Sequence, residues 1–251
     1  MFGHTHHYYL DSFKKMGLPI RSNKINSRKY TLNYNYFEHI DTHEKAYWLG
    51  FIYADGYLTN AKGSKKFGIA LSVKDKNHLE KLNKCLSSNY PIKTYQQKHG
   101  FSNNTQYCRL LITSDKIFDD LVKHGVYENK TNILTKPNIS EEFYPSFILG
   151  YLDGDGSIFL NKGKYPFYSI SFVGTDDILT FIHNYLQSIN IVNKNINLEK
   201  RKNGQIVSSI RYGGNILVSN ILDALYQYID INLPLDRKKE LYLKCKNRDF
   251  S

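Results

Sequence analysis

Hydrophobic and polar positions follow the same order in two stretches of the chain. Each stretch opens with apolar side chains at helical spacing, in THEKAYWLGFIYADG (residues 42–56) and in EEFYPSFILGYLDGDG (residues 141–156). Apolar and polar positions then alternate, as in FGIALSV (residues 67–73), which predicts a β-hairpin. A helix, two more strands and a last helix complete each stretch. Both stretches therefore predict the order α-β-β-α-β-β-α.

The expected elements recur at a fixed interval. In the first stretch strands are expected at 57–62, 66–74, 91–97 and 106–113, and helices at 75–86 and 115–124. In the second, strands are expected at 157–161, 167–173, 195–202 and 205–212, and helices at 176–188 and 215–229. Equivalent residues differ by 100, as Asp55 does from Asp155 and Leu79 from Leu179. This regularity indicates an internal duplication with pseudo-two-fold symmetry, which suits the pseudo-symmetric backbone of a nucleic-acid duplex.

The duplication divides the chain into four parts. Residues 1–42 are expected to form a basic N-terminal arm, which is either the remnant of a helix-turn-helix or a disordered tail. The two halves are expected at 43–125 and 141–251, and the second ends in a basic helix at 233–244. Residues 126–140 are polar and contain a proline, which predicts a linker.

The net charge and the cysteine content limit the kinds of function that the chain can have. The chain carries 34 Lys and Arg against 23 Asp and Glu, a net charge of +11, which favours a polyanionic partner such as nucleic acid. Its three cysteines lie far apart without CxxC spacing, so neither a zinc site nor a disulfide framework is expected. No apolar run approaches the roughly 18 residues of a membrane span. We expect an intracellular protein. The sequence does not distinguish an organellar, a bacterial and a phage origin.

The two opening helices end in closely matching nonapeptides. WLGFIYADG (Trp48–Gly56) and ILGYLDGDG (Ile148–Gly156) resemble the signature of the LAGLIDADG homing endonucleases, and the resemblance extends over residues 43–245. It implies an α+β fold of two pseudo-symmetric αββαββα halves. Each half would contribute a four-stranded antiparallel sheet to a DNA-binding saddle, and the halves would pack through the two motif helices.

Small residues in the motifs explain how two helices could meet. Gly50 and Ala54 lie four apart on one helical face, as do Gly150 and Gly154, so no bulky side chain would hold the helices apart. The glycines at 56 and 156 follow the expected helix ends, where a left-handed conformation would stop each helix. The last acidic residue of each motif would then lie beside its partner.

Two carboxylates in this position are unfavourable without a cation. A helix C-terminus carries partial negative charge, and Asp55 and Asp155 would also repel each other. We therefore expect them to hold Mg²⁺ as catalytic metal ligands, with the main-chain carbonyls of Ala54 and Gly154 as further candidates. Mn²⁺ is expected to substitute, and Ca²⁺ to support DNA binding without cleavage. Asp153 occupies the earlier acidic position of its motif and is expected either to be structural or to support the metal ligands without binding the metal itself.

The resemblance also implies basic side chains beside the metal ions. Lys74, at the end of the second expected strand, matches one such position, and Arg211, in the eighth, matches another. Their mates at the interval of 100 are Gly174 and Leu111, so the two active centres are expected to differ.

Outward-facing residues of the strands and hairpins would read DNA in the major groove. In the first half the candidates are Thr59, Lys62, Lys65, Lys66, Lys93, Tyr95, Gln97, Lys98 and Arg109. In the second they are Asn161, Lys162, Lys164, Lys200, Arg201, Lys202, Gln205 and Arg211. Because the two sets differ, the target is expected to be asymmetric.

The sequence thus predicts a monomeric, site-specific DNA endonuclease that cuts both strands with Mg²⁺ and leaves short 3′ overhangs. One alternative is a maturase that binds its own intron RNA through the same sheets without hydrolysis. Another is a non-cleaving DNA-binding regulator on this fold. Retention of both Asp55 and Asp155 favours the endonuclease.

Overall fold

The computed structural model of the protein describes residues 13, 15–17, 29–96, 106–130, 133–200 and 207–250. The described residues from Leu32 onward belong to one compact unit, Leu32–Ser251. Leu32, Tyr36 and Phe37 are buried in the core of the larger unit. These three residues therefore belong to the larger unit, although they lie within the segment expected as a basic arm.

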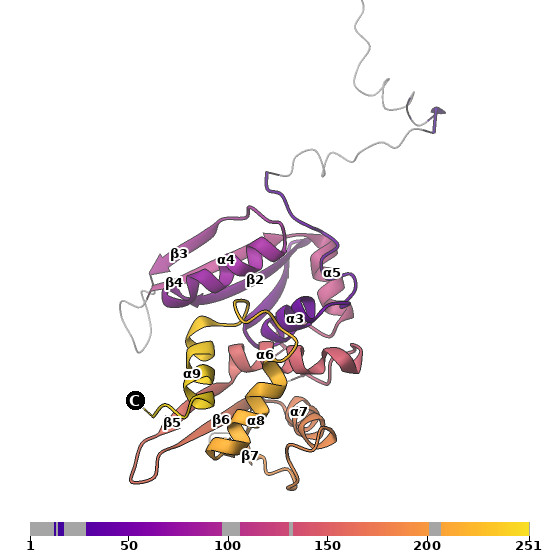
Figure 1. The fold of residues 1–251 in the computed structure, drawn as a ribbon. Helices are drawn as coiled ribbons and strands as arrows, with labels where there is room; N and C mark the ends of the chain where they lie inside the picture. Colours follow the sequence, from indigo (N-terminus) through magenta and orange to yellow (C-terminus); the bar gives the residue numbers. More distant parts are fainter. Residues whose placement is uncertain are drawn as a thin grey trace, which may run out of the picture. The chain divides into compact units, whose positions relative to one another are not determined.

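The first half consists of one four-stranded antiparallel sheet with helices against it (Figure 1). Its elements are α3 (His43–Asp55), β1 (Gly56–Ala61), β2 (Ser64–Ser72), the 3-10 turn η1 (Val73–Asp75), α4 (Lys76–Cys85), β3 (Ile92–Gln96), β4 (Gln106–Thr113) and α5 (Asp115–Lys123). The strands lie in the order β1-β2-β4-β3. Alternate strand residues such as Leu58, Phe67 and Leu110 are buried, so one face of the sheet joins the core.

The second half repeats this arrangement. Its elements are η3 (Glu141–Phe143), α6 (Tyr144–Asp155), β5 (Ser157–Asn161), β6 (Phe167–Gly174), α7 (Asp176–Ser188), β7 (Glu199–Lys200), β8 (Ser208–Gly213) and α8 (Asn215–Tyr226). The strand order is β5-β6-β8-β7, equivalent to that of the first sheet. The α+β class with two antiparallel sheets is therefore confirmed. Strand β7 is shorter than the expected 195–202, whose last two residues lie outside the described part of the chain.

The interval between the halves is not constant. Tyr57 pairs with Gly68 and Ser157 with Ser171, so the first strands are 100 apart and the second strands 103 apart. A longer loop between β5 and β6 accounts for the difference. In the first half the three-residue turn η1 follows β2 and offsets this difference. The next helices, which begin at Lys76 and Asp176, are therefore 100 residues apart again. Pairing Lys74 with Gly174 was therefore wrong, whereas Leu111 and Arg211 are equivalent, because they pair with Gly68 and Ser171.

Helices α3 and α6 pack directly against each other at the centre of the larger unit (Figure 1). A Cβ atom added at Gly50 would lie 1.9 Å from the carbonyl oxygen of Phe147, and one at Gly150 would lie 1.9 Å from that of Tyr47. One at Gly154 would lie 2.2 Å from the Cβ of Ala54. The two backbones are therefore in contact, as the small residues predict.

Both motif helices end in extended backbone. Gly56 has φ −75° and Gly156 has φ −95°, so the expected left-handed stop is wrong for both. Space explains the glycines instead. An added Cβ would lie 2.7 Å from the Ile52 carbonyl oxygen at Gly56 and 2.7 Å from that of Leu152 at Gly156. Each strand can therefore leave its helix only through a residue without a side chain.

A last helix, α9 (Asp236–Lys246), joins the second half to the first. Asp236 accepts hydrogen bonds from Lys81 (2.9 Å) and from Asn77 (2.9 Å), both on α4. Arg237 pairs with Asp75 at 3.2 Å, just before α4. The basic C-terminal helix thus braces both halves. No helix in the described residues combines the length and apolar character that a membrane span requires.

Candidate active site at the ends of the motif helices

Asp55 and Asp155 are the last residues of α3 and α6. The helices are still in close contact near this end, where a Cβ added at Gly154 would lie 2.2 Å from the Cβ of Ala54. Burial raises the pKa of Asp55 to about 6, and the negative charge of Asp155 acts in the same direction. The structure therefore brings the two predicted carboxylates into one electrostatic environment in which proton or cation binding is favoured.

Two lysines that sequence reasoning did not select lie beside these carboxylates. Lys130 is buried and donates a hydrogen bond from Nζ to the carbonyl oxygen of Ala54 (2.8 Å). Lys238 on α9, only 2% exposed, donates to the carbonyl oxygens of Leu152, Asp153 (2.8 Å) and Gly156 (2.7 Å). Lys130 thus binds a carbonyl at the C-terminal end of α3, and Lys238 binds carbonyls at the C-terminal end of α6 and just beyond it.

Burial and charge oppose each other at these ammonium groups. Burial lowers the pKa of Lys238 to about 8, although the charges of Asp153, Asp55 and Asp155 act to raise it. Burial also lowers the pKa of Lys130, against the charges of Asp155 and Asp55. Both lysines are thus close enough to the aspartates to partly neutralise them, and the charge of Arg237 acts on Asp55 in the same direction.

In each motif, the side chain of the residue just before Ala54 or Gly154 binds the chain segment that leads to the lysine. Asp153 accepts hydrogen bonds from the Tyr47 hydroxyl (2.6 Å) and from the main-chain N–H of Leu235 (2.8 Å), the residue preceding α9. Its counterpart Tyr53 donates to the carbonyl oxygen of His124 (2.5 Å), at the end of α5. Asp153 is therefore structural, as expected, and it holds the start of the helix that carries Lys238.

The basic residues selected from the sequence lie farther along the sheets. Lys74 is in η1, two residues beyond β2, and is exposed. Arg211 lies across β6 from Ser157, which follows the second motif directly, and its guanidinium is 5.4 Å from the centre of the Phe159 ring. Arg211 is thus in the row of the sheet closest to the motif, whereas no described contact joins Lys74 to the aspartates.

Opposite to its helix-covered face, the first sheet presents a face rich in hydroxyl and basic groups. By register, this open face carries Tyr57, Thr59, Lys66, Lys93, Tyr95 and Arg109. Lys62 lies in the turn between β1 and β2. Lys65 points to the other face, where it pairs with Asp119 of α5 at 2.5 Å, so its selection as an outward residue was wrong. Gln97 and Lys98 lie outside the described residues.

The open face of the second sheet is poorer in charge. Arg211 shares it with Ser157 and Ser171, whose hydroxyls are 2.7 Å apart, and with Asn161, which donates to the Ser169 hydroxyl at 2.8 Å. Lys162 and Lys164 are exposed in the β5–β6 loop. Lys200 pairs with Ser208 on the helix-covered side of an edge strand. Arg201, Lys202 and Gln205 lie outside the described residues.

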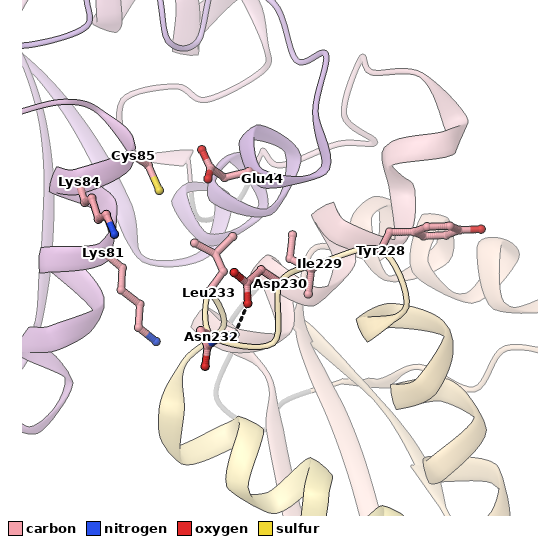
Figure 2. A pocket seen from close by; sticks show the side chains of 9 residues that line it. All are labelled: Glu44, Lys81, Lys84, Cys85, Tyr228, Ile229, Asp230, Asn232 and Leu233. Carbon is pink, nitrogen blue, oxygen red and sulfur yellow. Dashed lines mark hydrogen bonds between the residues drawn. The ribbon is translucent and has the colours of Figure 1, made fainter.

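A pocket elsewhere is less suited to chemistry. It lies between α3, α4 and the loop that follows α8, at the end of α3 opposite to Asp55 (Figure 2). Its Lys81 already binds Asp236, and its Glu44 accepts a hydrogen bond from the Tyr36 hydroxyl at 2.7 Å. Two of its charged groups are therefore engaged within the protein.

The donor set at the helix ends fits a magnesium ion that is completed by substrate. Among the described residues there is no cluster of three or more His, Cys, Asp or Glu side chains that could hold a metal by themselves. Mg²⁺ commonly binds through one or two carboxylates and takes its other ligands from water and phosphate. Asp55 and Asp155 match that requirement, and the raised pKa of Asp55 marks a charge that lacks full compensation.

Known proteins share both the motif and the fold. Residues 42–124 match the family described as the LAGLIDADG-like domain. The meganuclease I-SmaMI bound to uncleaveable DNA is similar in structure, with a TM-score of 0.53 and 15% identity over 80% of this chain and 89% of that chain. So is the I-LtrWI LAGLIDADG homing endonuclease bound to target DNA, with a TM-score of 0.52 and 15% identity over 86% of this chain and 93% of that one.

A third structure, the LAGLIDADG homing endonuclease I-GzeII in complex with its DNA target, gives a TM-score of 0.52 at 13% identity, over 80% of this chain and 88% of that one. No curated protein sequence matches the chain. Identities this low establish the fold alone. The chain thus contains a LAGLIDADG-like domain at residues 42–124 and has the two-sheet fold of the LAGLIDADG meganucleases.

Proposed function

We propose that this protein is a site-specific DNA endonuclease that hydrolyses both strands of a long, asymmetric duplex site with Mg²⁺ and leaves short 3′ overhangs. The observation that carries the proposal is the pairing of Asp55 and Asp155 at the ends of two helices in backbone contact. Similar folds in I-SmaMI, I-GzeII and I-LtrWI are bound to DNA, which supports the choice of substrate.

Within the site, the two aspartates would bind the metal ion, and the two lysines would compensate negative charge. Asp55 and Asp155 would hold Mg²⁺, which when bound supplies an activated water and charge stabilisation at the scissile phosphate. Lys130 and Lys238 bind the adjacent helix carbonyls. Their ammonium groups would then compensate the negative charge that grows during hydrolysis. A preorganised cation needs no rearrangement at that moment, which lowers the barrier.

The two open faces would read different half-sites. Within the described strands, the open face of the first sheet offers three cations, at Lys66, Lys93 and Arg109, whereas that of the second offers Arg211 among serine hydroxyls. Cations would increase affinity through phosphate and guanine contacts, and hydroxyls would accept or donate to several bases. Because both faces belong to one chain, a monomer would cover an asymmetric target.

Selection of cleaved sites from a randomised duplex library in Mg²⁺ tests the proposal. The wild-type protein should select one long sequence without a palindrome, with Mn²⁺ replacing Mg²⁺ and Ca²⁺ supporting binding only. Asp55→Asn and Asp155→Asn should each abolish cleavage while binding is retained or tightened, because repulsion from phosphate is relieved. The surface variant Asp177→Asn is the matched control and should cut normally. Cleavage by the double variant at a near wild-type rate would refute the assignment.

Competition with RNA distinguishes this function from that of a maturase. The major groove of duplex DNA is wide enough for a β-sheet, whereas that of an RNA helix is deep and narrow. In Ca²⁺, duplex DNA with the selected site should therefore displace a structured intron RNA at equal concentration. If the RNA wins by tenfold or more, the protein acts on RNA.

A further inference from the structure

We propose that Arg109 reads a guanine in the half-site bound by the first sheet, and that Tyr95 and Tyr57 hold its guanidinium ready for that contact. The inference rests on the proposed function and specifies one base of the substrate. Arg109 lies on β4 in the middle of the open face, between Ala70 of β2 and Lys93 of β3. Its neighbour on β2, Ala70, carries only a methyl group, and the Arg109 side chain is partly exposed.

Tyr95 fixes the guanidinium from one side. The Arg109 guanidinium lies 4.6 Å from the centre of the Tyr95 ring, and its terminal nitrogen donates to the Tyr95 hydroxyl at 2.9 Å. The Tyr95 ring is itself stacked on Tyr107, with centres 5.3 Å apart and planes within 18°. The guanidinium therefore rests on a rigid aromatic pair.

Tyr57 closes the other side. A Cβ added at Gly68 would lie 2.4 Å from Cζ and 2.5 Å from the hydroxyl oxygen of Tyr57, so this ring crosses β2 over a residue without a side chain. Gly68 pairs with Leu111, two residues from Arg109, and the Tyr57 hydroxyl thus reaches toward the guanidinium. Hydrogen bonding to Tyr95 raises the pKa of Arg109, and Tyr57 acts in the same direction.

In the described strands, no acidic side chain on the open face partners this guanidinium. Along the described strands, the open face of the first sheet carries hydroxyl, aromatic, aliphatic and basic side chains but no Asp or Glu. An arginine that is held in place without a carboxylate is prepared for an external acceptor. Guanine presents two acceptors, O6 and N7, on its major-groove edge, and they match the two parallel donors of a guanidinium.

Lys93 provides the contrast. It is the cross-strand neighbour of Arg109 and is exposed. Its ammonium is a point charge on a flexible stem, so it suits a phosphate, which carries no sequence information. Two adjacent cations on one sheet should therefore differ in what they recognise.

The test is selection of bound duplexes from a randomised library by wild type, Arg109→Gln and Lys93→Gln. Wild type should show one guanine in the first half-site whose replacement weakens binding by about ten- to a hundredfold. Arg109→Gln should lose that preference or shift it to adenine, whereas Lys93→Gln should weaken all sequences equally and keep it. Tyr95→Phe should reduce the preference while the protein melts as wild type.

An unchanged guanine preference in Arg109→Gln overturns the assignment of Arg109 and leaves the endonuclease intact. Selection of no duplex by the wild-type protein contradicts the endonuclease itself, so the two failures are distinguishable. Arg109 is half-exposed on the open face, and thermal unfolding of each variant verifies that the sheet is preserved.

Discussion

Replacing Asp55 by asparagine should make the protein more stable at neutral pH. Because the pKa of Asp55 is raised from 3.8 to about 6, the ionised carboxylate is less favourable in the folded chain than in the unfolded one. A tenfold change in proton affinity is worth about 1.4 kcal/mol, so the raised pKa costs the folded wild type at most about 3 kcal/mol at pH 7 and above. Hydrogen bonds that asparagine makes less well reduce the gain, so we expect about 1–3 kcal/mol.

The pH dependence of the gain follows from the same difference between the folded and unfolded chain. A raised carboxyl pKa means that the folded state binds the proton more tightly, so wild-type stability falls as pH rises from about 4 to 6. The advantage of Asp55→Asn should therefore be full above pH 7, roughly half at pH 5 and small at pH 4. Asparagine does not titrate, so the variant lacks this slope.

Urea unfolding at pH 7.5, 5 and 4, without divalent cations, measures the effect. In thermal melts the same gain should appear as a melting temperature higher by about 2–4 °C per kcal/mol. The control Asp177→Asn, on the exposed start of α7, should not stabilise. Adding Mg²⁺ should stabilise wild type more than the variant. If Asp55→Asn is neutral or destabilising at pH 7.5, Asp55 is already compensated, and the electrostatic reasoning for the site fails.

Three further predictions concern the helix pair, the lysines and salt. Gly50→Ala and Gly150→Ala should each prevent folding or lower the unfolding free energy by several kcal/mol in circular dichroism melts, because the added methyl would lie 1.9 Å from a backbone oxygen. Gly163→Ala, with no atom within 4 Å, should be neutral. Lys130→Met and Lys238→Met should each slow cleavage, measured in single-turnover assays, by about tenfold or more while site affinity changes little, since the charge acts on the transition state. A larger loss in affinity than in rate would show that the lysines act in binding. The affinity for the DNA site should fall by several powers of ten when the salt concentration rises a few-fold. An affinity that does not change with salt would contradict contacts to several phosphates.

Local pattern was sufficient for much of the fold. The bounds of β4, β5 and α7 follow from alternation and helical spacing that these segments carry within themselves. The backbone contact of the motif helices was likewise visible in their small residues. Strand β7 was overestimated because polar residues near 195–202 alternate as an exposed strand does, although only Glu199 and Lys200 pair in the described chain.

The features that the sequence did not predict depend on contacts between segments that lie far apart in the chain. Lys130 and Lys238 bind main-chain carbonyls on distant helices, and a carbonyl leaves no mark in the sequence that would single out one lysine among many. Lys65 was placed on the wrong face because its partner, Asp119, belongs to a later helix. The glycines after the motifs were predicted to adopt a left-handed turn. A side chain is excluded there instead by the carbonyl oxygen one helical turn earlier, and that contact depends on the direction in which the strand leaves the helix.

The position of Lys130 and Lys238 redefines the unit that was duplicated. Each half ends not at its last sheet-covering helix but at a trailing segment that returns a lysine to its own motif helix. A chimaera that exchanges halves with a related enzyme should therefore be joined after residue 130, inside the segment expected as a linker, so that each motif keeps its lysine. Such an exchange must also carry matched partners for α9, since Asp236 and Arg237 bind Lys81 and Asp75 of the opposite half. Compatibility between recombined halves would thus be limited by a few charged pairs on the outer surface, because the backbone contact of the central helices accepts any partner with small residues.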